Sequence, residues 1–253
     1  SIEVSRDDAK PEQGPARVGW FLTEEKGAVL FDATERVASR GANRAHAKSA
    51  RCPAVVQMES RYFMVRCPYD LHLGFGRDKD GKAVLINRAG TSSTIRGNKI
   101  AQVVTLVSEA EWRYADRPTI QLALPYCFIA DEPIYLTQLA AFAHYRTDPL
   151  PGTIFGGRFP LHIWPRPLMW AFEWHQTEKD LVLRRGEPLF YVQFETHDPA
   201  RAVQLVEAAR TAELMGYMNE LAAVTNYVNQ TFSLFEAAER LRPAKLLSER
   251  IRD

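Results

Sequence analysis

The sequence has little cysteine, no long apolar run and no excess of charge of either sign. Its three cysteines, Cys52, Cys67 and Cys127, cannot all pair with one another and lack metal-type spacing, so we expect reduced thiols and a cytoplasmic protein. No apolar stretch approaches the about 18 residues that cross a bilayer, so we expect no membrane partner. The chain carries 32 Lys and Arg against 31 Asp and Glu, a net charge of +1, so a role in binding nucleic acid is not expected.

The familiar catalytic motifs are also missing. The 253 residues contain no P-loop, no GxGxxG, no HExxH, no CxxC and no nucleophile elbow. These absences exclude the common nucleotide-binding, zinc-protease and serine-hydrolase patterns. The function must therefore be inferred from combinations of residues that are less specific than these motifs.

Short strand-like runs dominate the chain from Arg17 to Glu195. Examples are AVLINR, TIQLALPYCFIA and PLFYVQFE, with turn residues such as KDGK and ADRP between runs. About ten such runs in close succession predict a sandwich, a jelly roll or a barrel rather than βαβ units. We therefore expect an α+β chain, mainly β, in three parts: a flexible leader at 1–16, a β-rich domain at 17–197 and a C-terminal helical extension at 198–253.

The character of the sequence changes at Asp198, a natural helix N-cap that is followed by Pro199 at the first helical position. From there to Arg242 the pattern predicts a long helix, or a helix pair if Gly216 interrupts it. Mainly apolar side chains recur at a spacing typical of a packed stripe. The stripe consists of Leu214, Met218, Leu221, Thr225, Val228, Phe232 and Phe235. It either packs on the chain's own sheet or forms the interface of a homo-oligomer.

A second helix-like pattern, from Ala33 to Arg51, places basic side chains at every fourth position. These are Arg36, Arg40, Arg44 and Lys48. We interpret them as a solvated helix face, because Gly41 interrupts the pattern and no aromatic residue in this segment could stack on bases. The alternative is a surface for an anionic partner.

The stretch from 151 to 198 concentrates histidine, tryptophan and arginine. If LMWAFEWH is a strand, one face carries its aromatic side chains, Trp170, Phe172 and Trp174. Glu173 and His175 then project side by side from the other face, about 7 Å apart along the backbone. A carboxylate and an imidazole at this spacing suit a divalent transition metal (Fe, Mn, Ni or Zn), and a third ligand would complete a facial triad. The candidates for the third ligand are His162 and, behind it, His72.

A second strand-like run, YVQFETH, presents Gln193 and Glu195 on its polar face. We expect these two residues to act as a catalytic base or to orient the metal ligands, in a pocket where both polar faces converge. The residues expected to bind the substrate are Arg166 and Arg185, for an anionic group, and Trp164, for a planar one. In the competing interpretation the tryptophans belong to the core and the arginines form a solvated rim.

Two resemblances accompany these patterns. The run LRRGEPLFYVQF, a basic residue, a tight glycine turn and an apolar strand, resembles the last core strand of several β-barrel and jelly-roll families, cupins included. The HxH element with a following glutamate that marks metal cupins is missing. CPAV, GGRF and the FEWH…RGEP stretch are similar to uncharacterised bacterial and phage-encoded proteins over most of residues 50–200. The first resemblance implies a cupin-like fold, and the second implies no activity.

Together these patterns predict a cupin-like, non-haem, metal-dependent enzyme, such as a mononuclear oxygenase, that acts on a small anionic or aromatic substrate. The alternative is a non-catalytic, oligomeric binding or assembly protein that uses its C-terminal helix as the interface.

Overall fold

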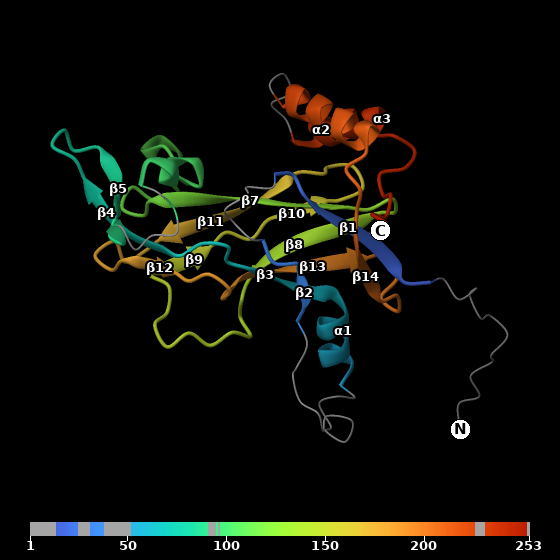
Figure 1. Cartoon of the computed structure of the whole chain (residues 1–253), viewed down its shortest axis with the longest axis horizontal. Helices are drawn as coiled ribbons and strands as arrows, with labels where there is room; N and C mark the ends of the chain where they lie inside the picture. Colours follow the sequence, from blue (N-terminus) through green and yellow to red (C-terminus); the bar gives the residue numbers. More distant parts are fainter. Residues whose placement is uncertain are drawn as a thin grey trace.

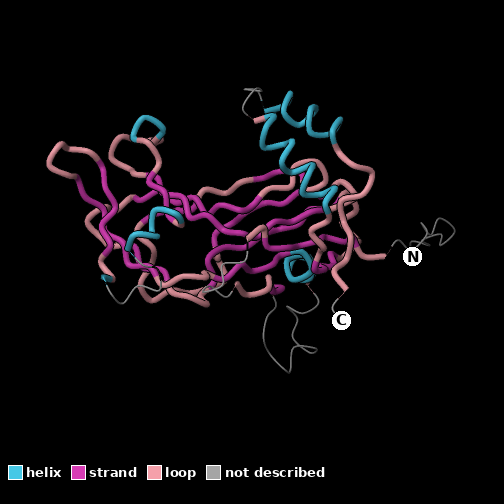
Figure 2. Tube along the Cα trace, turned by 45° about the horizontal axis from the view of Figure 1, so that its top comes forward, coloured by secondary structure: helices cyan, strands magenta, loops and turns pink. Residues whose placement is uncertain are grey.

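The computed structural model describes residues 14–24, 31–37, 52–90, 95, 97–225 and 231–251. Two β-sheets pack face to face at its centre, with a smaller sheet at one end and a helix pair at the other (Figure 1). Figure 2 shows the strands as one central block, with the helix pair outside it. The mainly β class predicted from the strand-like runs is confirmed.

The larger sheet, sheet A, has the strand order β14-β1-β7-β11-β9, and β6 also pairs with β7. Its strands are β1 (Ala16–Leu22), β6 (Val104–Leu106), β7 (Thr119–Ile129), β9 (Gly152–Ile154), β11 (Pro167–Trp174) and β14 (Val203–Glu207). All neighbours are antiparallel except β1 and β14, which run parallel. Because a jelly roll is built from antiparallel strands, this pair departs from that pattern, and the jelly-roll arrangement stays a prediction.

The opposing sheet, sheet B, has the order β10-β8-β13-β3-β2, and the small sheet C has the order β12-β4-β5. The strands of sheet B are β2 (Glu35–Arg36), β3 (Tyr62–Arg66), β8 (Ile134–Ala140), β10 (Arg158–Pro160) and β13 (Pro188–Thr196). Those of sheet C are β4 (Leu71–Arg77), β5 (Ala83–Asn87) and β12 (Leu181–Leu183). Two 3₁₀ segments, η4 (Gly97–Gln102) and η5 (Glu109–Glu111), flank β6.

The main core lies between sheets A and B and follows the strand alternation. The inward side chains of β11 are Trp170, Phe172 and Trp174, and those of β13 are Phe190, Val192 and Phe194; all are buried in one cluster. Phe128 of sheet A meets Phe194 of sheet B with ring centroids 5.4 Å apart. The predicted aromatic face of the LMWAFEWH run is therefore the core face, and the polar side chains between these residues point to the outside of the sandwich.

The chain has three α-helices in its described part: α1 (Pro53–Arg61), α2 (Ala212–Val224) and α3 (Thr231–Leu241). The prediction of a helix from Asp198 is wrong, because the segment that follows enters sheet A as β14. Asp198 instead accepts a hydrogen bond from the amide of Ala200 in a turn, and Thr211 caps α2 by accepting from the amide of Leu214. Pairing with β1 satisfies the backbone of residues 203–207 and outweighs their local helical pattern.

The helix pair packs on the outer face of sheet A. Leu214, Tyr217 and Leu221 are buried there in a second cluster, against Phe21 of β1 and Ile129 of β7. Leu214 and Leu221 of the predicted apolar stripe thus pack against the chain's own sheet. Phe232 on α3 is 83% exposed, and Val228 lies outside the described residues, so a homo-oligomer through this helix stays a prediction.

Two other predictions concern the N-terminal part of the chain. Arg36 lies in β2 rather than in a helix, where it donates to the carbonyl of Val203 and its guanidinium lies over the Phe63 ring. The other members of the basic stripe, Arg40, Arg44 and Lys48, lie outside the described residues, as do residues 1–13 of the predicted leader. Ala16 already belongs to β1 and is buried.

In the described segments, no helix combines the length and the apolarity that are needed to span a membrane.

Candidate functional site

Glu173 is an unusual residue on the outer face of sheet A. Its side chain is only 5% exposed, and it is the one carboxylate among the buried residues of the described segments. Taking a carboxylate out of water is unfavourable unless partners replace the lost hydration. Oxygen Oε2 of Glu173 has no hydrogen-bond partner within the described residues, so the compensation is incomplete. A buried charge that is only partly satisfied marks a candidate functional site.

The strand register explains how Glu173 comes to be buried. It lies in β11, with Thr119 of β7 directly opposite on one side and Thr153 of β9 directly opposite on the other. Two loops lie against the end of the strand: the amide of Trp174 donates to the carbonyl of Pro118, and the amide of His175 donates to the carbonyl of Pro151. Flanking strands and loops therefore enclose the carboxylate, although its face of the sheet points away from the core.

His175 is the closest partner of Glu173, and the two side chains lie side by side, as the strand alternation predicts. Nε2 of His175 lies 2.8 Å from Oε1 of Glu173 and 3.2 Å from Oγ1 of Thr153. A carboxylate only accepts hydrogen bonds, so it favours the tautomer with hydrogen on Nε2 and leaves Nδ1 as the basic nitrogen. The His175 side chain is 37% exposed, so part of the imidazole is accessible from solvent.

A basic and aromatic loop lies beside this pair. Nη1 of Arg117 is 3.8 Å from Oε1 of Glu173, and the Arg117 guanidinium lies 4.3 Å from the centre of the Tyr114 ring. Arg113 lies over the same ring at 5.4 Å. These residues were not predicted from the sequence. The signal that could have found them is the run WRYADRP, which places two arginines and a tyrosine in the turn before β7.

Gly152 allows β9 to approach β11 closely enough to bring Thr153 to His175. A Cβ at this position would overlap the backbone carbonyl of Glu173. We therefore expect Gly152→Ala to push β9 away from β11, to lower the free energy of unfolding by about 1–3 kcal/mol and to separate Thr153 from His175. Urea unfolding measures the first effect. Gly157→Ala is the matched control, because nothing lies within 4 Å of its added Cβ; equal effects of the two changes would contradict the close approach.

The structure does not bring the predicted third metal ligand to the pair. His162 lies after β10 of sheet B, with its ring 6.1 Å from that of Tyr135, and burial lowers its pKa. His72, the second choice, is bound to Asp180 at 2.7 Å on sheet C. Across the described segments no three His, Cys, Asp or Glu side chains are grouped closely enough to hold a metal ion. A transition metal needs such a set, so the described residues do not fit the predicted metal.

Gln193 and Glu195 do not converge with Glu173 and His175, and that prediction is wrong. Both residues lie in β13 of sheet B, and the polar faces of the two sheets point to opposite sides of the sandwich. Glu195 is paired there with Arg158 at 2.8 Å and accepts a hydrogen bond from Thr137. Sequence spacing alone could not assign β11 and β13 to different sheets.

The three predicted substrate-binding residues are dispersed. Trp164 is buried beneath the helix pair, with its ring 5.8 Å from that of Phe235, so it serves the core. Arg185 is exposed in the turn between β12 and β13, where its amide donates to Asp70. Arg166 lines a cavity in sheet A. None of the three lies among the residues that surround Glu173.

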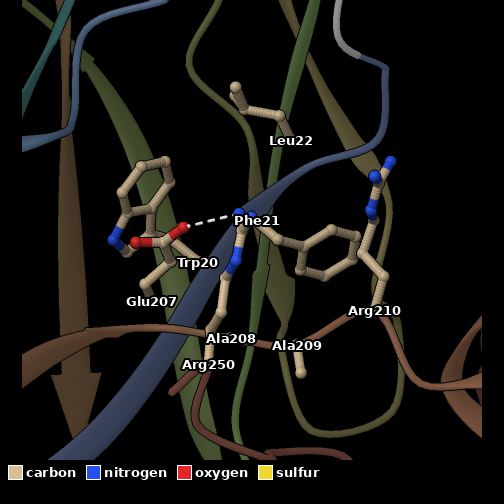
Figure 3. A pocket seen from close by; sticks show the side chains of 8 residues that line it. All are labelled: Trp20, Phe21, Leu22, Glu207, Ala208, Ala209, Arg210 and Arg250. Carbon is tan, nitrogen blue, oxygen red and sulfur yellow. Dashed lines mark hydrogen bonds and ion pairs between the residues drawn. The ribbon is translucent and has the colours of Figure 1, made fainter. Parts of the chain in front are cut away.

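A crevice of about 280 Å³ lies where β14 turns away from β1. Figure 3 shows Arg250 reaching Glu207 across it, and the two form an ion pair at 2.9 Å. Arg210, on the other side of the Phe21 ring, donates to the carbonyl of Thr23. Because these charged groups have partners within the chain, the crevice is a weaker candidate than the surroundings of Glu173.

Comparison with known proteins adds no assignment to this geometry. No protein-family model matches the chain, and neither the curated proteins nor the solved structures include a match.

Proposed function

We propose that the protein is an enzyme that removes a proton from a small anionic substrate at the Glu173–His175 pair. The observation that carries this proposal is the buried carboxylate of Glu173, 2.8 Å from a half-exposed imidazole and 3.8 Å from a guanidinium. Removal of a proton requires at least a base, a group that orients the base and a cation that stabilises the developing negative charge.

Each residue has a separate role in the proposed reaction. Nδ1 of His175 accepts the proton from the substrate, and the imidazolium that results is stabilised by the adjacent carboxylate of Glu173. The electron pair left on the substrate adds negative charge, which faces the guanidinium of Arg117. Glu173 is a positioning residue, because it fixes the tautomer and the ring orientation of His175 without contacting substrate.

The proposal keeps one part of the sequence-based hypothesis and replaces another. The small anionic substrate is retained, but Arg117 takes the role expected of Arg166 and Arg185. Metal chemistry is left out, because His162, the predicted third ligand, follows β10 of sheet B and does not join Glu173 and His175. The cytoplasm remains our proposed compartment, supported by three free cysteines, two of them buried.

Proton abstraction can be tested without the natural substrate. With 5-nitrobenzisoxazole, which opens when a base removes its carbon-bound proton, His175→Ala should lower the rate about 100-fold. Glu173→Gln should lower it about tenfold, because an amide holds the imidazole less firmly and does not stabilise the imidazolium. Benzoate should inhibit the wild type competitively, and Arg117→Gln should weaken this inhibition.

His197→Ala is the matched control, because His197 is exposed and lies outside the site. It should leave the rate unchanged, and thermal unfolding should show that every variant is folded. A His175→Ala variant that retains the wild-type rate would refute the proposal.

A further inference from the structure

A cavity of about 310 Å³ opens in sheet A between the end of β1, the middle of β7 and the start of β11. Two prolines explain the opening, because neither Pro125 nor Pro167 can donate a hydrogen bond to the sheet. The register of β7 and β11 shifts at this point: Pro167 lies opposite Cys127, whereas Met169 lies opposite Ala123. The extra residues of β7 bulge away from β11, and bulges of this kind often border binding sites.

The wall of the cavity is apolar and aromatic. Phe31, Leu124 and Leu168 line it together with Tyr69, whose ring meets that of Phe31 edge to face at 6.3 Å. Tyr69 is 1% exposed, and burial raises its pKa to about 12, so its hydroxyl is protonated at neutral pH. The wall therefore suits an apolar or aromatic group, as is usual for small-molecule sites.

Two residues of opposite charge also line the cavity, together with the polar side chains of Thr23 and Gln102. Arg166 is exposed and supplies a guanidinium, and Glu24 supplies a carboxylate. Glu24 already interacts with another residue, but a carboxylate has acceptor capacity for several hydrogen bonds. A cation and an anion beside one apolar wall are complementary to a ligand that carries both charges and an apolar group.

We propose that this cavity binds a free α-amino acid with an apolar side chain. The α-carboxylate pairs with Arg166, the α-ammonium group pairs with Glu24, and the side chain lies on Phe31, Leu124 and Tyr69. The volume is at the lower end of the range for ligand pockets, which suits a ligand of this size. The cavity is lined by none of the residues of the proposed proton-transfer site, so the two proposals stand separately.

Isothermal titration of the full chain tests this assignment with three probes. L-Phenylalanine should bind, and 3-phenylpropanoate (no ammonium group) and phenethylamine (no carboxylate) should each bind about tenfold more weakly or worse. Arg166→Gln should weaken L-phenylalanine and 3-phenylpropanoate at least tenfold but leave phenethylamine unchanged. Glu24→Gln should show the opposite selectivity.

The matched control is Arg185→Gln, which removes an exposed arginine that does not line the cavity and should not alter binding. His175→Ala should also bind L-phenylalanine normally, which separates this proposal from the enzymatic one. The assignment is overturned if L-phenylalanine does not bind in the millimolar range, if Arg166→Gln binds it as the wild type does, or if 3-phenylpropanoate binds equally well.

Discussion

A chain that ends at Ala209 is expected to lose its fold, although both central sheets remain complete in its sequence. The truncation removes α2, α3 and the tail, which together cover part of the outer face of sheet A around Phe21 and Ile129. It uncovers Phe21, Ile129 and Trp164, and it removes their buried partners Leu214 and Leu221. Each fully buried side chain of this kind contributes about 1.5–3 kcal/mol, so the sum rivals the whole stability of a typical domain.

Circular dichroism and the yield of soluble protein measure this outcome. The control is a chain that ends at Arg250, which loses the 86% exposed Ile251 and should fold normally. The tail before it must stay, because Oδ1 of Asp131 accepts hydrogen bonds from the amides of Leu246 and Leu247. A soluble, cooperatively folded chain 1–209 would show instead that the helix pair is an independent appendage.

Arg61→Ala is expected to lower the free energy of unfolding by about 3 kcal/mol or more. Arg61 is 6% exposed, and burial lowers its pKa, although a guanidinium stays charged in proteins. It donates to five groups: the side chains of Gln57 and Thr196 and the carbonyls of Asp198, Pro199 and Arg201. Alanine leaves the turn after β13 without these donors, although Gln57 of α1 still donates to the carbonyl of Pro199.

Denaturant unfolding of three variants isolates the cause. Arg61→Lys should recover less than half of the loss, because an ammonium group has three donors and no planar fork. Arg240→Ala removes an exposed arginine of α3 and should change stability by less than about 0.5 kcal/mol. If Arg61→Ala were as mild as Arg240→Ala, the buried hydrogen bonds would contribute little to the fold.

The sequence predicted those features of the fold that depend on neighbouring residues. Alternation along β11 and β13 correctly separated core from polar faces, because a strand turns successive side chains to opposite sides. The same rule placed Glu173 beside His175. Residues 203–207 were misassigned to a helix because their partner β1 lies at the other end of the chain, and no local pattern encodes that pairing.

The candidate site was predicted only in part, for a related reason. His162 shares a short stretch of sequence with Glu173, yet β10 and β11 belong to opposite sheets. Conversely, Arg117 precedes Glu173 by many residues but lies beside it, because β7 and β11 are neighbours. The order of strands in a sheet decides which residues lie beside one another on neighbouring strands. The spacing of residues along the sequence does not reveal that order.

The parallel pair of β1 and β14 also bears on how the chain folds. Ala16 pairs with Val203, so β1 leaves the ribosome long before the strand that pairs with it in sheet A. Contacts of such long sequence separation slow folding and leave strand edges and apolar faces exposed in the meantime. During synthesis the edge of β1 and the face of sheet A that later receives the helix pair are therefore open to aggregation, and chaperones that bind apolar segments would act at this stage.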